Sequence, residues 1–269
     1  MLTRLAFVGA NDELCQSLTK ASQGKDLQVV SMPPGGNVPL GATAVAADGA
    51  DTDALVNVAL TIGAWNEQLL DLLAEAIDCR EGFFIGSSRR VKEHASRFAE
   101  ALSLSPDERF SLERSACVRD IGKLKIPNQV LLKEGVLTYD EWVLLQQHPE
   151  IGGEIVERTA GLKDTAEVVR FHHECFDGDG YPRGLEGGQI PHLARVMKII
   201  DVYCAMTSPR HYREGHSSHD EAIEYLRSER GKHYDPELLD VFIERQVGRP
   251  DIVETATREG NEGTPSDTL

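Results

Sequence analysis

Apolar residues recur at helical spacing over most of the chain. Between residues 89 and 102, for example, Val91, Ala95 and Phe98 fall on one face of a helix. The same spacing predicts further helices over 105–117, 138–148, 152–160, 194–206, 220–229 and 236–246. The pattern therefore predicts a mainly α-helical protein.

The N-terminal part has a different pattern, in which short apolar runs alternate with polar segments. Leu5–Ala10, Leu27–Met32 and Ala42–Ala47 are strand-like runs, and Asn11 and Asp12 can begin a helix between the first two. An order of strand, helix and strand is typical of a parallel sheet. We therefore expect a small α/β domain over residues 1–63, in front of the helical part.

Residues 64–81 are predicted to form a helix that connects the two parts. Its apolar positions share one face and are Trp65, Leu69, Leu72, Leu73, Ala76 and Ile77. This face has two interpretations, which are packing against the helical domain and self-association of two copies of the chain. So few turns do not separate the two interpretations, and a homodimer through this connector helix stays open.

The charge and apolar content of the chain limit its partners. The formal net charge is −16 at pH 7, and no basic stretch of useful length offsets it, so DNA and RNA are not expected partners. No run of about 18 apolar residues occurs, so no membrane association is expected. Residues 249–269 lack aromatic and periodic positions, which predicts a disordered tail.

The cysteines indicate a reducing compartment. There are five, and none forms a closely spaced pair. They are Cys15, Cys79, Cys117, Cys175 and Cys204. Scattered cysteines in apolar segments are typical of packed thiols, so we expect a cytoplasmic protein.

Candidate chemistry concentrates between residues 171 and 213. His172 and His173 end an apolar run, so a helix can deliver two imidazoles together into a cleft, as a metal site requires. The segment 177–182 follows with the sequence DGDGYP, whose glycines and proline force the backbone to turn sharply beside the imidazoles. Asp201 then lies inside an otherwise apolar helix, where a carboxylate needs a cationic partner.

These motifs resemble those of a known family. The run from His172 to Pro191 reads HHECFDGDGYPRGLEGGQIP, and the helix that follows reads ARVMKIIDVYCAMTSPRHYR. Both resemble the HD-GYP family of bacterial metal-dependent phosphodiesterases that cleave cyclic di-GMP. The resemblance extends from about Gly82 to about Arg245, and it implies an all-helical HD-GYP domain over residues 82–248.

The resemblance implies a set of metal ligands. These are Asp120, His148, His172, His173 and Asp201. The first four would form one centre that is rich in nitrogen and suits iron, manganese or zinc. The second centre would retain only Asp201 and the shared Asp120.

Two further ligands of the family are absent from this sequence. The histidine of the His-Asp pair is Arg119, which cannot ligate a metal, and the histidine upstream of Val91 is Ser87. The glutamate that some members use for a third metal is Phe83. We therefore expect the second metal site to be lost, with the Arg119 guanidinium occupying its position and neutralising Asp120 or Asp201.

The resemblance also implies catalytic and substrate-binding residues. Asp120 and Lys123 match catalytic positions of the family. Lys123, Arg210 and Arg213 match the cations that hold the phosphates of the dinucleotide, and Tyr181 and Pro182 belong to the loop that lines its pocket.

The N-terminal pattern resembles a shortened receiver domain. Receivers place two acids after the first strand to bind magnesium, but Gly9 and Ala10 occupy these positions here. One of three acids, Asp48, Asp51 or Asp53, remains available as a phospho-acceptor, although turns rich in Asp and Gly are common anyway. A domain that contacts another protein is the preferred interpretation.

The preferred function is an HD-GYP protein of cyclic di-GMP signalling with a degraded metal site. It would be a weak or inactive phosphodiesterase that acts as a nucleotide-binding sensor or a protein-interaction module. One alternative is an active phosphodiesterase that yields the linear dinucleotide pGpG or GMP through the remaining metal. A second alternative is a structural module that binds no nucleotide.

Overall fold

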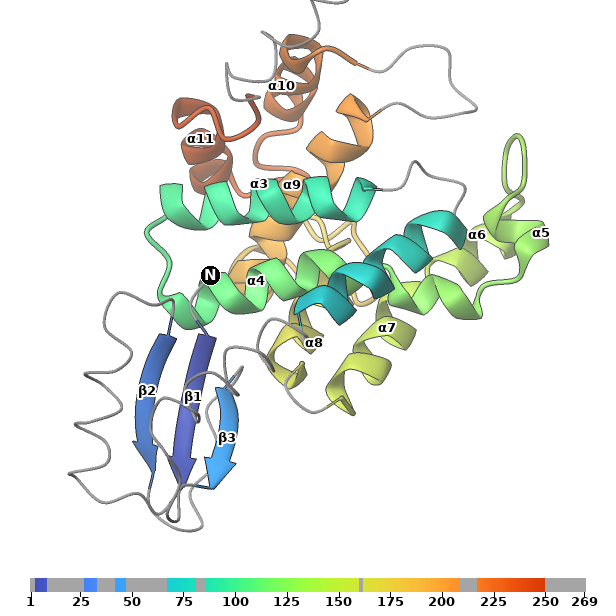
Figure 1. The fold of residues 1–269 in the computed structure, drawn as a ribbon. Helices are drawn as coiled ribbons and strands as arrows, with labels where there is room; N and C mark the ends of the chain where they lie inside the picture. Colours follow the sequence, from blue (N-terminus) through green and yellow to red (C-terminus); the bar gives the residue numbers. More distant parts are fainter. Residues whose placement is uncertain are drawn as a thin grey trace, which may run out of the picture.

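The structure is a computed structural model of the whole chain. It describes residues 3–8, 27–32, 42–46, 67–80, 86–159, 162–208 and 217–249. Helices dominate the described part (Figure 1), as the apolar periodicity predicts.

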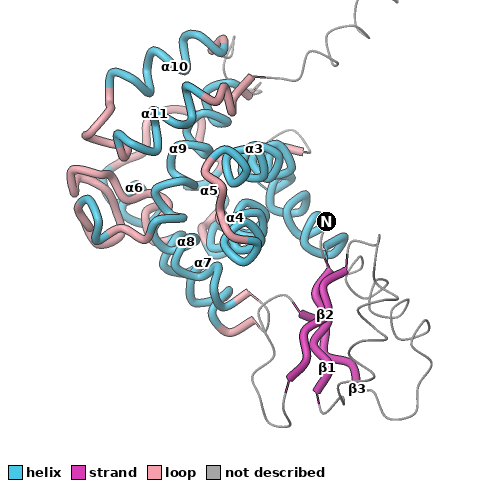
Figure 2. The backbone as a smooth tube through the Cα atoms, turned by 90° about the vertical axis from the view of Figure 1, so that its left-hand side faces the viewer, coloured by secondary structure: helices cyan, strands magenta, loops and turns pink. Residues whose placement is uncertain are grey.

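Three parallel strands form the described N-terminal structure. They are β1 (Thr3–Val8), β2 (Leu27–Met32) and β3 (Ala42–Ala46), and their order in the sheet is β2-β1-β3. Leu5 of β1 pairs with Val29 of β2 and with Thr43 of β3. Figure 2 shows the three strands together, in magenta. The three predicted strands are therefore confirmed, within two residues at each end. The receiver-like character of this part stays a prediction, since Gly9, Ala10 and residues 48–53 lie outside the described residues.

The helical domain begins with an unlabelled helix over residues 67–80 and continues to residue 249. Its further elements are α3 (Ser87–Ala101), α4 (Pro106–Val118), η1 (Ile121–Lys125), α5 (Asn128–Leu131), α6 (Tyr139–Leu145), α7 (His148–Glu157), η2 (Lys163–Thr165), α8 (Ala166–Phe171), η3 (Gly187–Gln189), α9 (His192–Thr207), α10 (His219–Ser228) and α11 (Pro236–Glu244).

Capping residues fix where these helices begin. Ser105 caps α4 by accepting from the Glu108 amide, and the Glu108 carboxylate accepts from the Ser105 amide in return. The same reciprocal pair of hydrogen bonds caps the start of α6 at Thr138 and the start of α10 at Ser218. Asp235 caps α11, as the Asp-Pro sequence predicts. The predicted starts of α4, α6 and α11 are thus confirmed.

Helix α9 lies at the centre of the larger hydrophobic core. Val196, Met197, Ile199 and Ile200 of α9 are all fully buried, and they pack with residues of α3, α4, α10 and α11. Figure 1 shows α9 behind α3 in the middle of the bundle. Asp201 follows these residues directly, so the core fixes the position of this carboxylate.

The helix over 67–80 contributes to a second core. Ala74 and Ile77 are buried against residues of α4, α7 and α8, and Leu70 and Leu73 pack at the edge. The packing interpretation of the connector helix therefore holds for this face. Leu69 and Leu72, which the sequence places on the same face, are 59% and 62% exposed. Self-association through these two residues stays a prediction.

The sequence also makes predictions about membrane contact and about the C-terminal tail. Among the residues that the structure describes, none of the helices combines the length and apolar character needed to cross a membrane. The predicted tail lies outside the described residues from position 250 onward.

Candidate metal centre

Four of the predicted ligands come together in the helical domain. Asp120 lies between α4 and η1, His148 begins α7, and His172 and His173 follow α8. Each of the four offers a ligand atom, and these atoms all lie within 4.8 Å of one another. Asp120, His148 and His172 are buried, and His173 is half-buried. The site therefore combines three imidazoles and one carboxylate from three separate parts of the chain.

Backbone hydrogen bonds fix the orientation of two imidazoles. Nδ1 of His148 donates to the carbonyl of Leu145 at 2.7 Å, and Nδ1 of His172 donates to the carbonyl of Val169 at 2.8 Å. In a neutral ring with this tautomer, the Nε2 atom carries the lone pair. Both Nε2 atoms are buried and accept no hydrogen bond from the described residues. Buried lone pairs without a donor fit a metal ion, because a metal would satisfy both.

Burial lowers the pKa of two of the imidazoles, His172 and His173. It lowers the pKa of His172 to about 4, although the carboxylates of Asp201 and Asp120 act in the opposite direction. The pKa of His173 is also held well below its usual value, first by burial and then by the neighbouring His172 and His148. Neutral imidazole is the form that ligates metals.

Asp120 remains ionised in the same environment. Burial opposes its charge, but Lys123 and Arg119 outweigh burial and hold the pKa of Asp120 well below its usual range. The Lys123 ammonium lies 2.9 Å from Oδ1, and Nη2 of Arg119 lies 3.3 Å from Oδ2. The carboxylate is thus available as an anionic ligand at neutral pH.

The Arg119 guanidinium contacts Asp201, which is not part of the four-residue group. Its Nε atom donates to Oδ1 of Asp201 at 2.8 Å, while Nη2 faces Asp120. Burial opposes the charge of Asp201, but Arg119 lowers its pKa below the usual value. The guanidinium therefore bridges the two carboxylates that a second metal ion would share. These contacts agree with the predicted neutralisation of Asp120 or Asp201, whereas the lost metal position itself stays a prediction.

A serine of α3 lies beside this guanidinium. Ser88 is buried, and its Oγ accepts from Nη1 of Arg119 at 3.3 Å. Ser87, which the sequence places at the lost histidine position, is the half-buried neighbour in the same turn. Ser88 is a contact that the motif comparison did not identify, because only the register of α3 determines which serine faces inward.

The loop at Tyr181 and Pro182 lies against the imidazoles. The Tyr181 ring stacks on His173 with centroids 4.8 Å apart. The buried Glu174 accepts from the backbone amides of Arg183 and Leu185 and holds the loop in place. Gly180 allows the close approach, since a Cβ there would lie 2.1 Å from the Cys175 nitrogen.

A cavity of about 420 Å³ opens beside this loop. It is lined by Val143, Gln146, Gln147, Glu150, Ile151, Tyr181 and Pro182. Tyr181 contacts His173 and also lines the cavity, so the cavity adjoins the candidate centre. Pro182 lines it too, as the resemblance implies for the substrate pocket.

Two predicted phosphate ligands lie outside the described residues, namely Arg210 and Arg213. Sequence reasoning also missed several residues around the site. Glu174 belongs to the recognised motif, but the motif gives it no role, and Asp78 and Arg80 lie on the predicted connector helix. No short motif marks these two residues, because they reach the site through tertiary contacts.

The helical domain matches a known protein family. A family model described as HD domain matches residues 71–238, which is more than half of the chain. The match begins within the helix over 67–80, which supports including that helix in the helical domain.

The chain is similar to several bacterial phosphodiesterases. It is 38% identical over 178 residues to the cyclic di-GMP phosphodiesterase response regulator RpfG of Xanthomonas campestris, covering 65% of this chain and 47% of that protein. It is 33% identical over 199 residues to a cyclic di-GMP phosphodiesterase of Thermotoga maritima, covering 73% and 52%. The chain thus spans about half the length of these curated relatives.

A solved structure shares the fold. The crystal structure of a cyclic GMP-AMP specific phosphodiesterase of Vibrio cholerae (V-cGAP3) aligns with a TM-score of 0.53 and 20% identity. The alignment covers 70% of this chain and 50% of that one.

Proposed function

The chain belongs to the HD domain family and to its HD-GYP branch, and we propose that it binds a cyclic dinucleotide at a degraded metal site and hydrolyses it weakly or not at all. In this role it would act as a nucleotide-binding sensor or as a protein-interaction module in cyclic di-GMP signalling. The names of the relatives support the ligand class, since they specify cyclic di-GMP and 3′3′-cGAMP.

One observation carries the proposal. The guanidinium of Arg119 is buried and contacts both Asp120 and Asp201, where a binuclear site would hold its second ion. An arginine stabilises phosphate charge, but it cannot lower the pKa of a bound water. Replacing an ion by a guanidinium therefore retains binding and removes part of the hydrolytic chemistry.

The remaining group is suited to a single metal ion. Asp120, His148, His172 and His173 would hold iron, manganese or zinc, because three imidazoles and one carboxylate suit these ions. When bound, such an ion supplies Lewis acidity toward a phosphate oxygen. Lys123 would add positive charge for the phosphates, and the cavity beside Tyr181 would accept one nucleoside.

The alternative is an active phosphodiesterase that yields pGpG or GMP. The intact four-residue group and the nearby Lys123 favour it. In that case Arg119 would stabilise the charge that develops on the phosphate during cleavage. The two proposals differ only in turnover, so they are separable by one assay.

A protein partner or a second copy of the chain belongs to the same proposal. Leu69 and Leu72 expose apolar surface on the helix that precedes α3. Such surface favours contact with another protein.

Metal analysis and an overnight incubation test the proposal. We expect one transition-metal ion per chain and binding of cyclic di-GMP with little or no product. The His172→Ala variant should lose the ion, and the surface control His233→Ala should retain it. Rapid formation of pGpG or GMP would favour the active enzyme, and two ions per chain would contradict the loss of the second metal site. Absence of both metal and nucleotide binding would leave only the structural module.

A repair experiment tests the missing ligands directly. The double variant Ser87→His with Arg119→His should bind a second ion and hydrolyse cyclic di-GMP faster than the wild type. Ser87 is the better position to change, because Ser88 already donates to Asp78. Unchanged metal content in the folded double variant would contradict the predicted positions of the lost ligands.

A further inference from the structure

The C-terminal end of the helix over 67–80 reaches both sides of the candidate metal centre. Asp78 contacts α3 on one side, and on the other Arg80 donates to the carbonyl of Lys123 in η1 at 3.5 Å. These two elements carry Ser88 and Lys123, which contact Arg119 and Asp120 respectively. A helix that the sequence presents as a connector is therefore placed to affect the site.

Asp78 is buried and is bound to Ser88 twice. Its Oδ2 accepts from the Ser88 amide at 3.0 Å, and its Oδ1 accepts from the Ser88 hydroxyl at 2.6 Å. Because the hydroxyl proton is donated to Asp78, only the lone pairs of Ser88 Oγ are available to other groups. Asp78 thereby makes Ser88 an acceptor.

Arg119 donates a hydrogen bond to Ser88 Oγ. Its Nη1 donates to Ser88 Oγ at 3.3 Å and to the Ala116 carbonyl at 2.8 Å, while Nε donates to Asp201. Contacts on both sides hold the planar guanidinium in one orientation. The hydrogen bonds therefore run from Asp78 through Ser88 and Arg119 to Asp201.

Arg80 supports the opposite side of the site. Its Nη2 donates to the Ile126 carbonyl at 2.6 Å, and its Nη1 donates to Asn128 at 2.8 Å. Ile126 directly follows η1, the element that carries Lys123. The same helix thus fixes the C-terminal end of η1.

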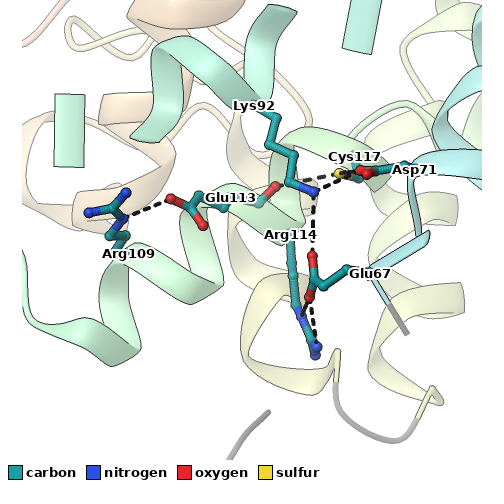
Figure 3. A network of polar contacts seen from close by, with 7 residues as sticks. All are labelled: Glu67, Asp71, Lys92, Arg109, Glu113, Arg114 and Cys117. Carbon is teal, nitrogen blue, oxygen red and sulfur yellow. Dashed lines mark hydrogen bonds and ion pairs between the residues drawn. The ribbon is translucent and has the colours of Figure 1, made fainter. Parts of the chain in front are cut away.

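Ion pairs hold the other end of this helix. Figure 3 shows Glu67 and Asp71 directed toward Lys92, with Arg114 also on Glu67. The Lys92 ammonium lies 2.7 Å from Asp71 and 3.3 Å from Glu67. A helix held at both ends can maintain a fixed position for Asp78.

We propose that Asp78 is a positioning residue that acts through the Ser88 hydroxyl to orient the Arg119 guanidinium between Asp201 and Asp120. The consequence for nucleotide binding rests on the proposed function. The orientation of the guanidinium itself does not depend on it.

A purely structural role of Asp78 makes a different prediction. Asp78 also accepts from the Ser88 amide at the start of α3, which stabilises the helix regardless of Arg119. Ser88→Ala retains this amide bond and removes only the hydroxyl. Ser88→Thr retains both. These two variants therefore separate orientation of Arg119 from capping of α3.

The test measures hydrogen exchange of the Arg119 Nε–H group by ¹⁵N NMR on the full chain, with and without Zn²⁺. The resonance is assigned by its loss in Arg119→Lys. We expect exchange at least ten-fold faster in Ser88→Ala and Asp78→Asn, and wild-type exchange in Ser88→Thr. Ser115→Ala is the control for a buried serine of α4, and Asp235→Asn is the control for a buried capping aspartate. Both controls should exchange as the wild type does.

Two outcomes overturn the proposal. The first is wild-type exchange in folded Ser88→Ala, and the second is equally fast exchange in Ser88→Ala and Ser115→Ala. A cyclic di-GMP titration of the same variants is evaluated separately. If the wild type binds no nucleotide while the exchange pattern holds, the proposed function fails and the positioning role of Asp78 stands.

Discussion

Gly122 determines how closely η1 approaches the start of α7. A Cβ at this position would lie 1.9 Å from the His148 carbonyl oxygen and 2.7 Å from the Gly152 nitrogen. Backbone atoms cannot move aside as a flexible side chain can. The glycine is thus what allows Asp120 and His148 to lie in the same site.

Gly122→Ala should therefore destabilise the fold and disturb the site. We expect a loss of about 2–3 kcal/mol in the free energy of unfolding, in the range of an overpacked core. Gly188→Ala is the control, because nothing lies within 4 Å of its Cβ position, and it should change stability by less than about 0.5 kcal/mol. Equal denaturation midpoints for the two variants would contradict the close approach.

His94 predicts a pH dependence that lies outside the candidate centre. It is buried on α3, where Nδ1 donates to the Val247 carbonyl at 3.2 Å and the ring packs edge-on against Tyr203. Burial, followed by the positive charge of Arg90, lowers the pKa of His94 to about 4.

The sign of this effect follows from proton binding. Below pH 6.5 the unfolded chain protonates His94, whereas the folded chain does not until about pH 4. The contribution of His94 to the free energy of unfolding is consequently complete above pH 6.5. It falls by about 3 kcal/mol as the pH drops to 4. His94→Gln should lose correspondingly less over this range in denaturant titrations. Parallel pH curves for the variant and the wild type would contradict the assignment.

At the residue scale, the sequence predicts the candidate metal ligands better than the residues that surround them. Asp120, His148, His172 and His173 stand in recognisable motif order, and the structure brings them together. Ser88 carries no such signal, because its contact with Arg119 depends on the rotation of α3. Local patterns do not report that rotation.

At the element scale, the helix over 67–80 illustrates what periodicity leaves open. Leu69 and Leu73 belong to one predicted face, yet Leu69 is exposed and Leu73 packs at the edge of the core. A stripe of apolar residues does not specify which part of it meets a neighbour. The ion pairs of Glu67 and Asp71 with Lys92 add to the buried contacts of Ala74 and Ile77, and the sequence does not mark them because acidic positions on a surface helix are usually solvated.

Lys92→Met tests this docking. The variant removes the cation shared by Glu67 and Asp71, so we expect a loss of about 1–2 kcal/mol, less than a fully buried pair because Asp71 is partly exposed. Lys232→Met removes an exposed lysine near Glu229 and should cost less than about 0.5 kcal/mol. Thermal unfolding of both variants supplies the comparison. A Lys92→Met variant as stable as Lys232→Met would show that the ion pairs do not hold the helix.

At the scale of the whole molecule, the fold class and the parallel strands follow from the sequence, whereas the relation between the parts does not. Apolar spacing predicts the helical domain because its helices bury one face each. The receiver resemblance of the first 63 residues depends on acids that lie outside the described residues.

Metal binding should stabilise the whole helical domain, because the four candidate ligands come from elements that separate on unfolding. An ion present at about 100 times its Kd adds about 2.7 kcal/mol of stability by mass action. For a domain of this size the melting temperature should rise by roughly 5–10 °C. Thermal unfolding with Zn²⁺ and with a chelator measures this rise. His172→Ala should abolish the rise, and His233→Ala, which lies outside the four-residue group, should preserve it. A shift that survives in His172→Ala would mean that the ion binds elsewhere.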